Sequence, residues 1–84
     1  MPTVTMQPGN EYIVTAAETA SGSKTLKISG VQIPYTLTIS GSNPTNHTTP
    51  LGNYNFHTVN KDASAKIENN AATNNPLGNL IVSY

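Results

Sequence analysis

Hydrophobic and polar residues alternate with a period of two along much of the chain, which is the pattern of half-buried β-strands. Shorter alternating or apolar runs occupy residues 12–16, 25–29, 54–59 and 80–84. Together these runs predict a chain built from short strands. The longest run places apolar side chains on one face and mostly Thr and Ser on the other: Val31, Ile33, Tyr35, Leu37 and Ile39.

Two segments interrupt this pattern. Pro34 lacks the N–H that a central strand needs, so we expect it at a sheet edge, at a bulge or among the first residues of its strand. Residues 41–50 are rich in Pro, Asn and Thr. We expect them to form the longest structureless loop, and loops of that length in compact domains are often functional.

Residues 61–75 allow two interpretations. Ala63, Ile67 and Ala71 recur at a helical spacing. A strand would instead point Ala65 and Ile67 inward and the charged residues between and after them outward. Because the Asn-rich end of the segment disfavours a long helix, we prefer a short strand.

Short strands separated by turns rich in Gly, Pro, Asn and Ser are typical of small antiparallel sandwiches and barrels. The alternation accounts for six to seven short strands, and a chain of 84 residues is the size of one domain. We therefore expect an all-β fold, a small antiparallel β-sandwich or barrel, in which residues 1–84 form a single domain.

Charged residues are unusually scarce. They make up 10% of the chain, the formal net charge is zero, and about 25% is typical of soluble domains. The polar surface must therefore be built from Thr, Asn, Ser and Gly, and proteins near zero net charge tend to associate. Nucleic-acid binding needs clustered basic residues, but the lysines are dispersed: Lys24, Lys27, Lys61 and Lys66.

The sequence shows no catalytic or metal-binding motif. The chain has no cysteine, which removes disulfides, thiolate nucleophiles and cysteine-based metal sites. No nucleophile elbow, metal-binding helix motif or Gly-rich phosphate loop is present. His47, in the predicted loop, and His57, expected on the outward face of a strand, have no third ligand at a telling spacing. We therefore expect no enzyme activity, no cofactor and no metal site.

A sugar-binding loop is one hypothesis for function. Asn amides can bind sugar hydroxyl groups and an aromatic ring can stack on a sugar, so the candidate binding loop consists of Asn43, Asn46, His47, Asn53 and Tyr54.

The small number of aromatic residues that could stack on a sugar weakens this hypothesis. The chain has no Trp, four Tyr and one Phe. Alternation places most of these rings on the apolar side of their strands, where they would belong to the core: Tyr12, Tyr35, Tyr54 and Phe56.

The two ends of the chain suggest an assembly role. Residues 1–10 are expected to form an extended N-terminal arm, bounded by Pro2 and Pro8, which cannot take part in continuous ladder pairing. Such an arm can add a strand to an open edge of a neighbouring chain. The alternative is that both ends pair within the same domain. The candidate interface consists of Met1, Pro2, Thr3, Val4, Thr5, Met6 and Gln7.

From composition and architecture we expect a non-enzymatic structural assembly protein. The most specific form of this hypothesis is a phage or viral capsid decoration (cement) protein, or another small virion component, that bridges neighbouring subunits and forms homo-oligomers. A small carbohydrate-binding module is the alternative. No signal peptide and no apolar stretch of membrane-spanning length is visible. The expected location is therefore the virion or, failing that, the cytoplasm or the extracellular space.

Overall fold

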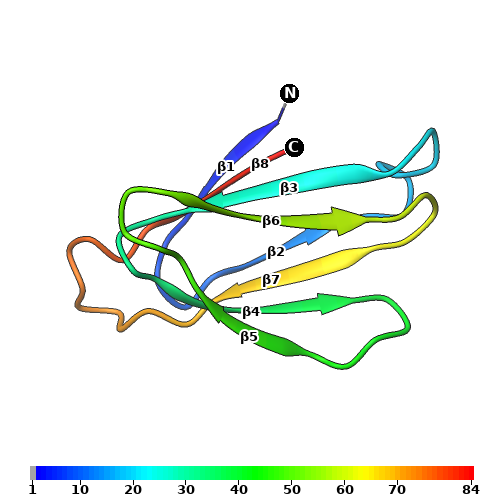
Figure 1. Cartoon of the computed structure of the whole chain (residues 1–84). Coiled ribbons are helices and arrows are strands. Elements are labelled where there is room, and N and C mark those ends of the chain that lie inside the picture. Colours follow the sequence, from blue (N-terminus) through cyan, green and yellow to red (C-terminus); the bar gives the residue numbers. More distant parts are fainter. Residues whose placement is uncertain (1) are drawn as a thin grey trace.

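The computed structural model describes residues 2–84 as two four-stranded antiparallel sheets packed face to face (Figure 1). The first sheet has the order β1-β8-β3-β6. The second has the order β2-β7-β4-β5. This arrangement confirms the expected all-β antiparallel fold and, of the two alternatives left open, it is a sandwich and not a barrel. The strands are β1 (Thr3–Met6), β2 (Glu11–Val14), β3 (Lys24–Ser29), β4 (Pro34–Ile39), β5 (Thr45–Thr48), β6 (Tyr54–Val59), β7 (Ala65–Asn69) and β8 (Leu80–Ser83).

The described residues contain eight strands. The two that the sequence analysis did not predict as strands are β1 and β5. Strand β5 lies inside residues 41–50, where a structureless loop was expected, and pairs with β4. Pro34 is the first residue of β4, one of the positions predicted for it. The ambiguous segment at residues 61–75 contains β7, whose Ala65 and Ile67 are buried, so the preferred strand interpretation is confirmed.

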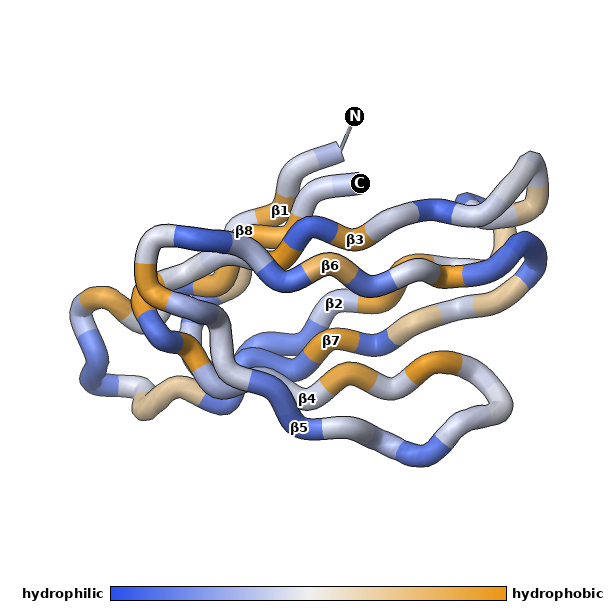
Figure 2. Tube along the Cα trace, in the orientation of Figure 1, coloured by the Kyte–Doolittle hydropathy of each residue, from blue (hydrophilic) through white to orange (hydrophobic). Residues whose placement is uncertain are grey.

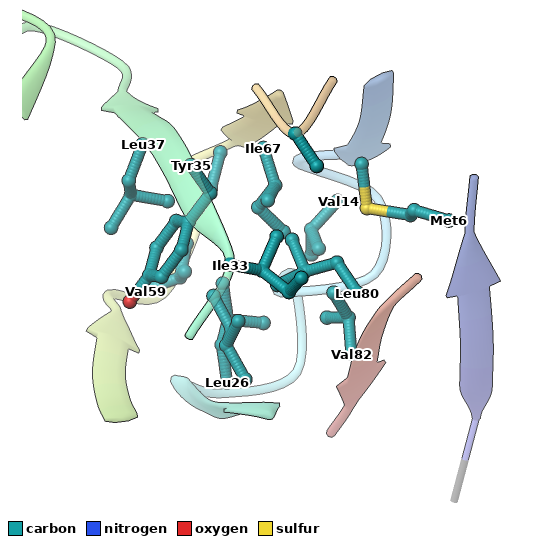
Figure 3. Packing of buried hydrophobic residues seen from close by; sticks show 13 residues of the cluster. Met6, Val14, Leu26, Ile33, Tyr35, Leu37, Val59, Ile67, Leu80 and Val82 are labelled. Atoms are coloured by element: carbon teal, nitrogen blue, oxygen red, sulfur yellow. The ribbon is translucent and has the colours of Figure 1, made fainter. Parts of the chain in front are cut away.

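The core lies between the two sheets and takes alternate residues from both of them. Figure 2 shows the hydrophobic positions recurring along the strands, and Figure 3 shows their side chains meeting between the sheets. Tyr35 is the largest of the fully buried side chains. The cluster consists of Met6, Val14, Leu26, Ile28, Ile33, Tyr35, Leu37, Val59, Ala65, Ile67, Ala71, Leu80 and Val82.

Strand β6 faces the opposite way from the prediction. Tyr54 and Phe56 were expected in the core, but they lie on the outer face and are 44% and 61% exposed. Val59 is fully buried, and because side chains alternate along a strand, Asn55 and His57 share its inward side. The inward position of His57 also corrects the expectation that it faces outward.

Of residues 1–10, expected as an extended arm, Thr3–Met6 form a strand that pairs with its own chain, and Pro8 and Gly9 form a turn. Strand β1 forms a ladder with β8, and these two strands lie side by side in Figure 1. Met6 is only 2% exposed and belongs to the core. Of the candidate interface residues, Pro2, Thr3, Thr5 and Gln7 are exposed and Val4 is half-buried. Met1 lies outside the described residues.

Asn69 anchors this end of the sandwich. It is a buried polar residue at the end of β7. Its side-chain amide donates to the main-chain oxygens of Met6 at 3.0 Å and Gly78 at 2.8 Å, and its Oδ1 accepts from the Ala71 N–H at 3.0 Å. The side chain therefore links β1 of the first sheet to β7 of the second.

Candidate functional site

Three of the exposed large hydrophobic side chains lie on the outer face of the first sheet, namely Tyr54, Phe56 and Ile81. Register places Tyr54 opposite Ser29, which is in turn opposite Ile81. Phe56 lies opposite Lys27 in the next outward-facing row. We call Lys27, Tyr54, Phe56 and Ile81 the aromatic face.

Lys27 and the two aromatic rings contact one another on this face. The Lys27 Nζ lies 3.8 Å from the centroid of the Tyr54 ring, which is a cation–π geometry. The Tyr54 and Phe56 ring centroids are 6.3 Å apart, within the range of tilted aromatic pairs. The Lys27 ammonium group therefore covers part of the Tyr54 ring, while Phe56 remains open to solvent.

A hollow of about 420 Å³ adjoins the aromatic face at Tyr54. Two loops form it, one after β3 and one before β6. Val31 and Leu51 provide its large aliphatic side chains, and both are exposed, at 46% and 68%. The full lining consists of Ser29, Gly30, Val31, Leu51, Gly52, Asn53 and Tyr54.

Reciprocal hydrogen bonds between Ile33 and Thr49 hold the two loops together. The Ile33 N–H donates to Thr49 Oγ1 at 2.7 Å, and the Thr49 N–H donates to the Ile33 carbonyl at 2.9 Å. Both residues are buried. Gly30 fits closely beneath them, because a Cβ there would lie 2.7 Å from Ile33 Cγ1. The hollow is therefore built on fixed backbone.

Only part of the predicted binding loop reaches this site. Asn53 and Tyr54 line the hollow. Asn43 is exposed before β5, whereas Asn46 and His47 lie on β5 in the second sheet. Asn46 Oδ1 accepts a hydrogen bond from Thr36 Oγ1 at 2.9 Å, so the oxygen of this amide is already engaged.

Sequence reasoning missed Lys27, Phe56 and Ile81 on the aromatic face, and Val31 and Leu51 in the hollow. Val31 was assigned to the core because it continues the apolar alternation that leads into β4. Phe56 is exposed because it lies on the side of β6 that faces solvent, and the hydrophobic pattern of β6 did not predict which side that is.

The two histidines meet on the inner side of the sandwich, between β5 and β6. Their ring centroids are 4.7 Å apart, and the His47 ring stacks on Tyr35 with centroids 5.3 Å apart. The Tyr35 hydroxyl lies 2.7 Å from His57 Nε2 and accepts a hydrogen bond from Asn55 Nδ2 at 2.9 Å. The inward-facing polar side chains of β6, Asn55 and His57, therefore both have the Tyr35 hydroxyl as a hydrogen-bond partner.

Burial shapes the acid–base behaviour of this cluster. Desolvation, together with the neighbouring His47, lowers the pKa of His57. Desolvation raises the pKa of Tyr35, although the hydrogen bond from Asn55 opposes that change. At neutral pH both groups are therefore uncharged, and the cluster is a hydrogen-bonded part of the structure.

Across residues 2–84, no group of three or more His, Cys, Asp or Glu side chains is placed to hold a metal ion. No helix in the described part of the chain has the length and apolar character needed to cross a membrane.

No protein-family model, no curated protein and no solved structure matches this chain.

Proposed function

We propose that this chain is a non-enzymatic structural assembly protein that docks onto neighbouring protein subunits through the aromatic face and its hollow. The observation that carries this proposal is that five of the seven exposed large hydrophobic side chains of the described residues, Tyr54, Phe56, Ile81, Val31 and Leu51, lie on the aromatic face or in the adjoining hollow. Contiguous exposed apolar surface of this kind marks interaction sites.

The chemistry of the hollow suits a protein partner. Its large side chains are the aliphatic Val31 and Leu51 and the aromatic Tyr54, and its polar side chains are Ser29 and Asn53. Interfaces between proteins are rich in aromatic residues and have an apolar centre with a polar rim. An apolar side chain of a partner would fill the hollow, and Asn53 and Lys27 would lie at its rim.

A decoration protein of a phage or viral capsid is the specific form of this proposal. A small rigid β-sandwich with no net charge can cover a lattice without long-range repulsion between copies. Each contact can be weak, because several simultaneous contacts raise the overall affinity by avidity. The protein would then be located in the virion.

The experiment is to express the chain together with its genomic neighbours and to separate any particle by density-gradient sedimentation. The proposal expects the chain to sediment with a particle of defined stoichiometry and to remain there after washing. A chain that stays at the top of the gradient while a particle forms without it would refute the proposed role.

A sugar-binding module is the second candidate, and the exposed rings favour it. Tyr54 and Phe56 are open to solvent, and Asn53 lies beside Tyr54 in the hollow. Asn53 Oδ1 accepts a hydrogen bond from the Tyr54 N–H at 2.9 Å, so a ring and an amide nitrogen would be offered to a sugar together. A glycan array tests this candidate. Saturable binding to one defined sugar that is lost in Tyr54→Ala would replace the assembly proposal, whereas the assembly proposal expects no such binding.

A further inference from the structure

The four edges of the two sheets differ in how well they are protected. Strands β1, β2 and β5 are edge strands of four residues each, whereas β6 has six. Proteins commonly protect sheet edges with short strands, prolines and charged side chains. Pro2 precedes β1, Glu11 begins β2, and β5 lies between Pro44 and Pro50.

Strand β6 has none of these protections. Its sequence, Tyr54-Asn55-Phe56-His57-Thr58-Val59, contains no proline, lysine or acidic residue. It pairs with β3 on one side, and within residues 2–84 no strand lies on its other side. A long edge of this kind with an exposed Phe56 is a template for strand addition.

We propose that the β6 edge pairs antiparallel with β6 of a second copy of this chain, which joins two first sheets into one continuous sheet across a two-fold axis. This inference rests on the proposed assembly function and names the partner of one surface. A second copy suits the edge because β6 carries no lysine or acidic side chain, so two copies bring no such charges face to face. The chain as a whole also has a formal net charge of zero, which removes net repulsion between copies.

The alternation of β6 restricts how two copies can pair. Directly opposite residues of an antiparallel pair point to the same face of the sheet. Tyr54, Phe56 and Thr58 point outward and Asn55 and His57 inward. One residue must therefore lie directly opposite its own copy, and the two-fold axis passes midway between the two; that residue is described below as lying on the axis.

Of the possible registers, we favour the one with Phe56 on the axis. Residues 54–58 of one copy then lie opposite residues 58–54 of the other. Phe56 packs against its own copy, and each Tyr54 packs against a Thr58. The register with His57 on the axis would instead place two imidazoles directly opposite each other. In the favoured register each His57 lies opposite an Asn55, and the two aromatic faces become neighbours in one extended surface.

Single-cysteine variants test the pairing directly, because the natural chain has no cysteine. Directly opposite Cα atoms in antiparallel strands are about 4.5–5.5 Å apart, which is within the span of a disulfide. Under mild oxidation we expect Phe56→Cys to give covalent dimers much faster than Thr3→Cys. Thr3 is the matched control, because it is exposed on the opposite edge strand of the same sheet. Equal rates at the two positions would overturn the pairing.

Charge variants provide a second test that keeps the chain free of cysteine. By sedimentation velocity, the purified wild-type chain should dimerise with increasing concentration, and Phe56→Lys and Phe56→Glu alone should both remain monomeric. A mixture of the two variants should recover the dimer, because opposite charges then meet on the axis. A wild-type chain that stays monomeric at all concentrations, or a mixture that does not associate, would overturn the proposal. Both tests use the purified chain alone, so their failure differs from failure to bind a particle.

Discussion

The Tyr35 hydroxyl lies 2.7 Å from His57 Nε2, and together they join the inner sides of β4 and β6. This contact explains how β6 can turn a histidine toward the core while exposing Tyr54 and Phe56. The inward polar groups find partners in one another, so burying them leaves none unsatisfied among the described residues.

This arrangement predicts that mild acid destabilises the fold. Burial and His47 lower the pKa of His57 below 6.5, so the unfolded chain binds the proton more tightly than the folded chain. The free energy of unfolding is therefore undiminished by His57 above pH 6.5, the pKa of a histidine in the unfolded chain. It falls progressively as the pH drops below 6.5 toward the lower pKa of His57 in the folded chain.

Urea unfolding at about pH 7.5 and about pH 5.5 measures this loss. In His57→Gln, which keeps a polar partner for Tyr35, the difference between the two pH values should shrink. An unchanged difference would show that other groups cause the acid sensitivity.

The buried amide of Asn69 predicts a large loss of stability on truncation. Asn69→Ala leaves the main-chain groups of Met6, Gly78 and Ala71 without their partner. We expect a loss of about 2–3 kcal/mol, because buried polar groups without partners are costly. Chemical denaturation is the measurement, and Asn70→Ala is the control, because Asn70 is exposed and its loss should change stability by less than about 1 kcal/mol. Similar losses in both variants would contradict this role for Asn69.

The N-terminal strand predicts that the first residues contribute to stability. Met6 is 2% exposed, and Met6→Ala should lower the free energy of unfolding by about 2–5 kcal/mol. The neighbouring Thr5 is exposed, so Thr5→Ala should have little effect. If Met6→Ala unfolds at the same urea concentration as the wild type, β1 does not contribute to the core as described.

The sequence predicted those strands whose burial follows their own pattern. In β4, Tyr35 and Leu37 point inward, whereas Thr36 between them does not. In β7, Ala65 and Ile67 likewise point inward. Each of these strands lies inside the second sheet with a neighbour on both sides. Hydrophobic alternation is therefore sufficient to assign their faces.

Two of the edge strands, β5 and β6, were harder to predict, because their own residues do not determine their place. Strand β5 reads Thr-Asn-His-Thr and has no apolar signal, and it exists through its pairing with β4. In β6 the apolar residues fall on both faces of the strand. Val59 is the one that packs into the core, so Tyr54 and Phe56 lie on the exposed face. The aromatic face could not be predicted for this reason, since it depends on packing between distant segments.

We propose docking through the aromatic face and its hollow, and paired surface variants separate these side chains from other exposed apolar residues. Leu51→Ser with Ile81→Ser removes exposed apolar side chains from the hollow and the aromatic face without touching β6. Ile13→Ser with Leu77→Ser removes side chains of the same types and comparable exposure, 50% and 62%, from elsewhere on the surface. Each pair should change stability by less than about 1 kcal/mol.

The measurement is the fraction of each folded variant that sediments with the particle formed by its genomic neighbours. We predict that the Leu51 and Ile81 pair loses at least about tenfold in particle binding, which corresponds to about 1.4 kcal/mol, while the Ile13 and Leu77 pair binds like the wild type. Equal binding by both pairs would contradict the claim that this surface is the docking site.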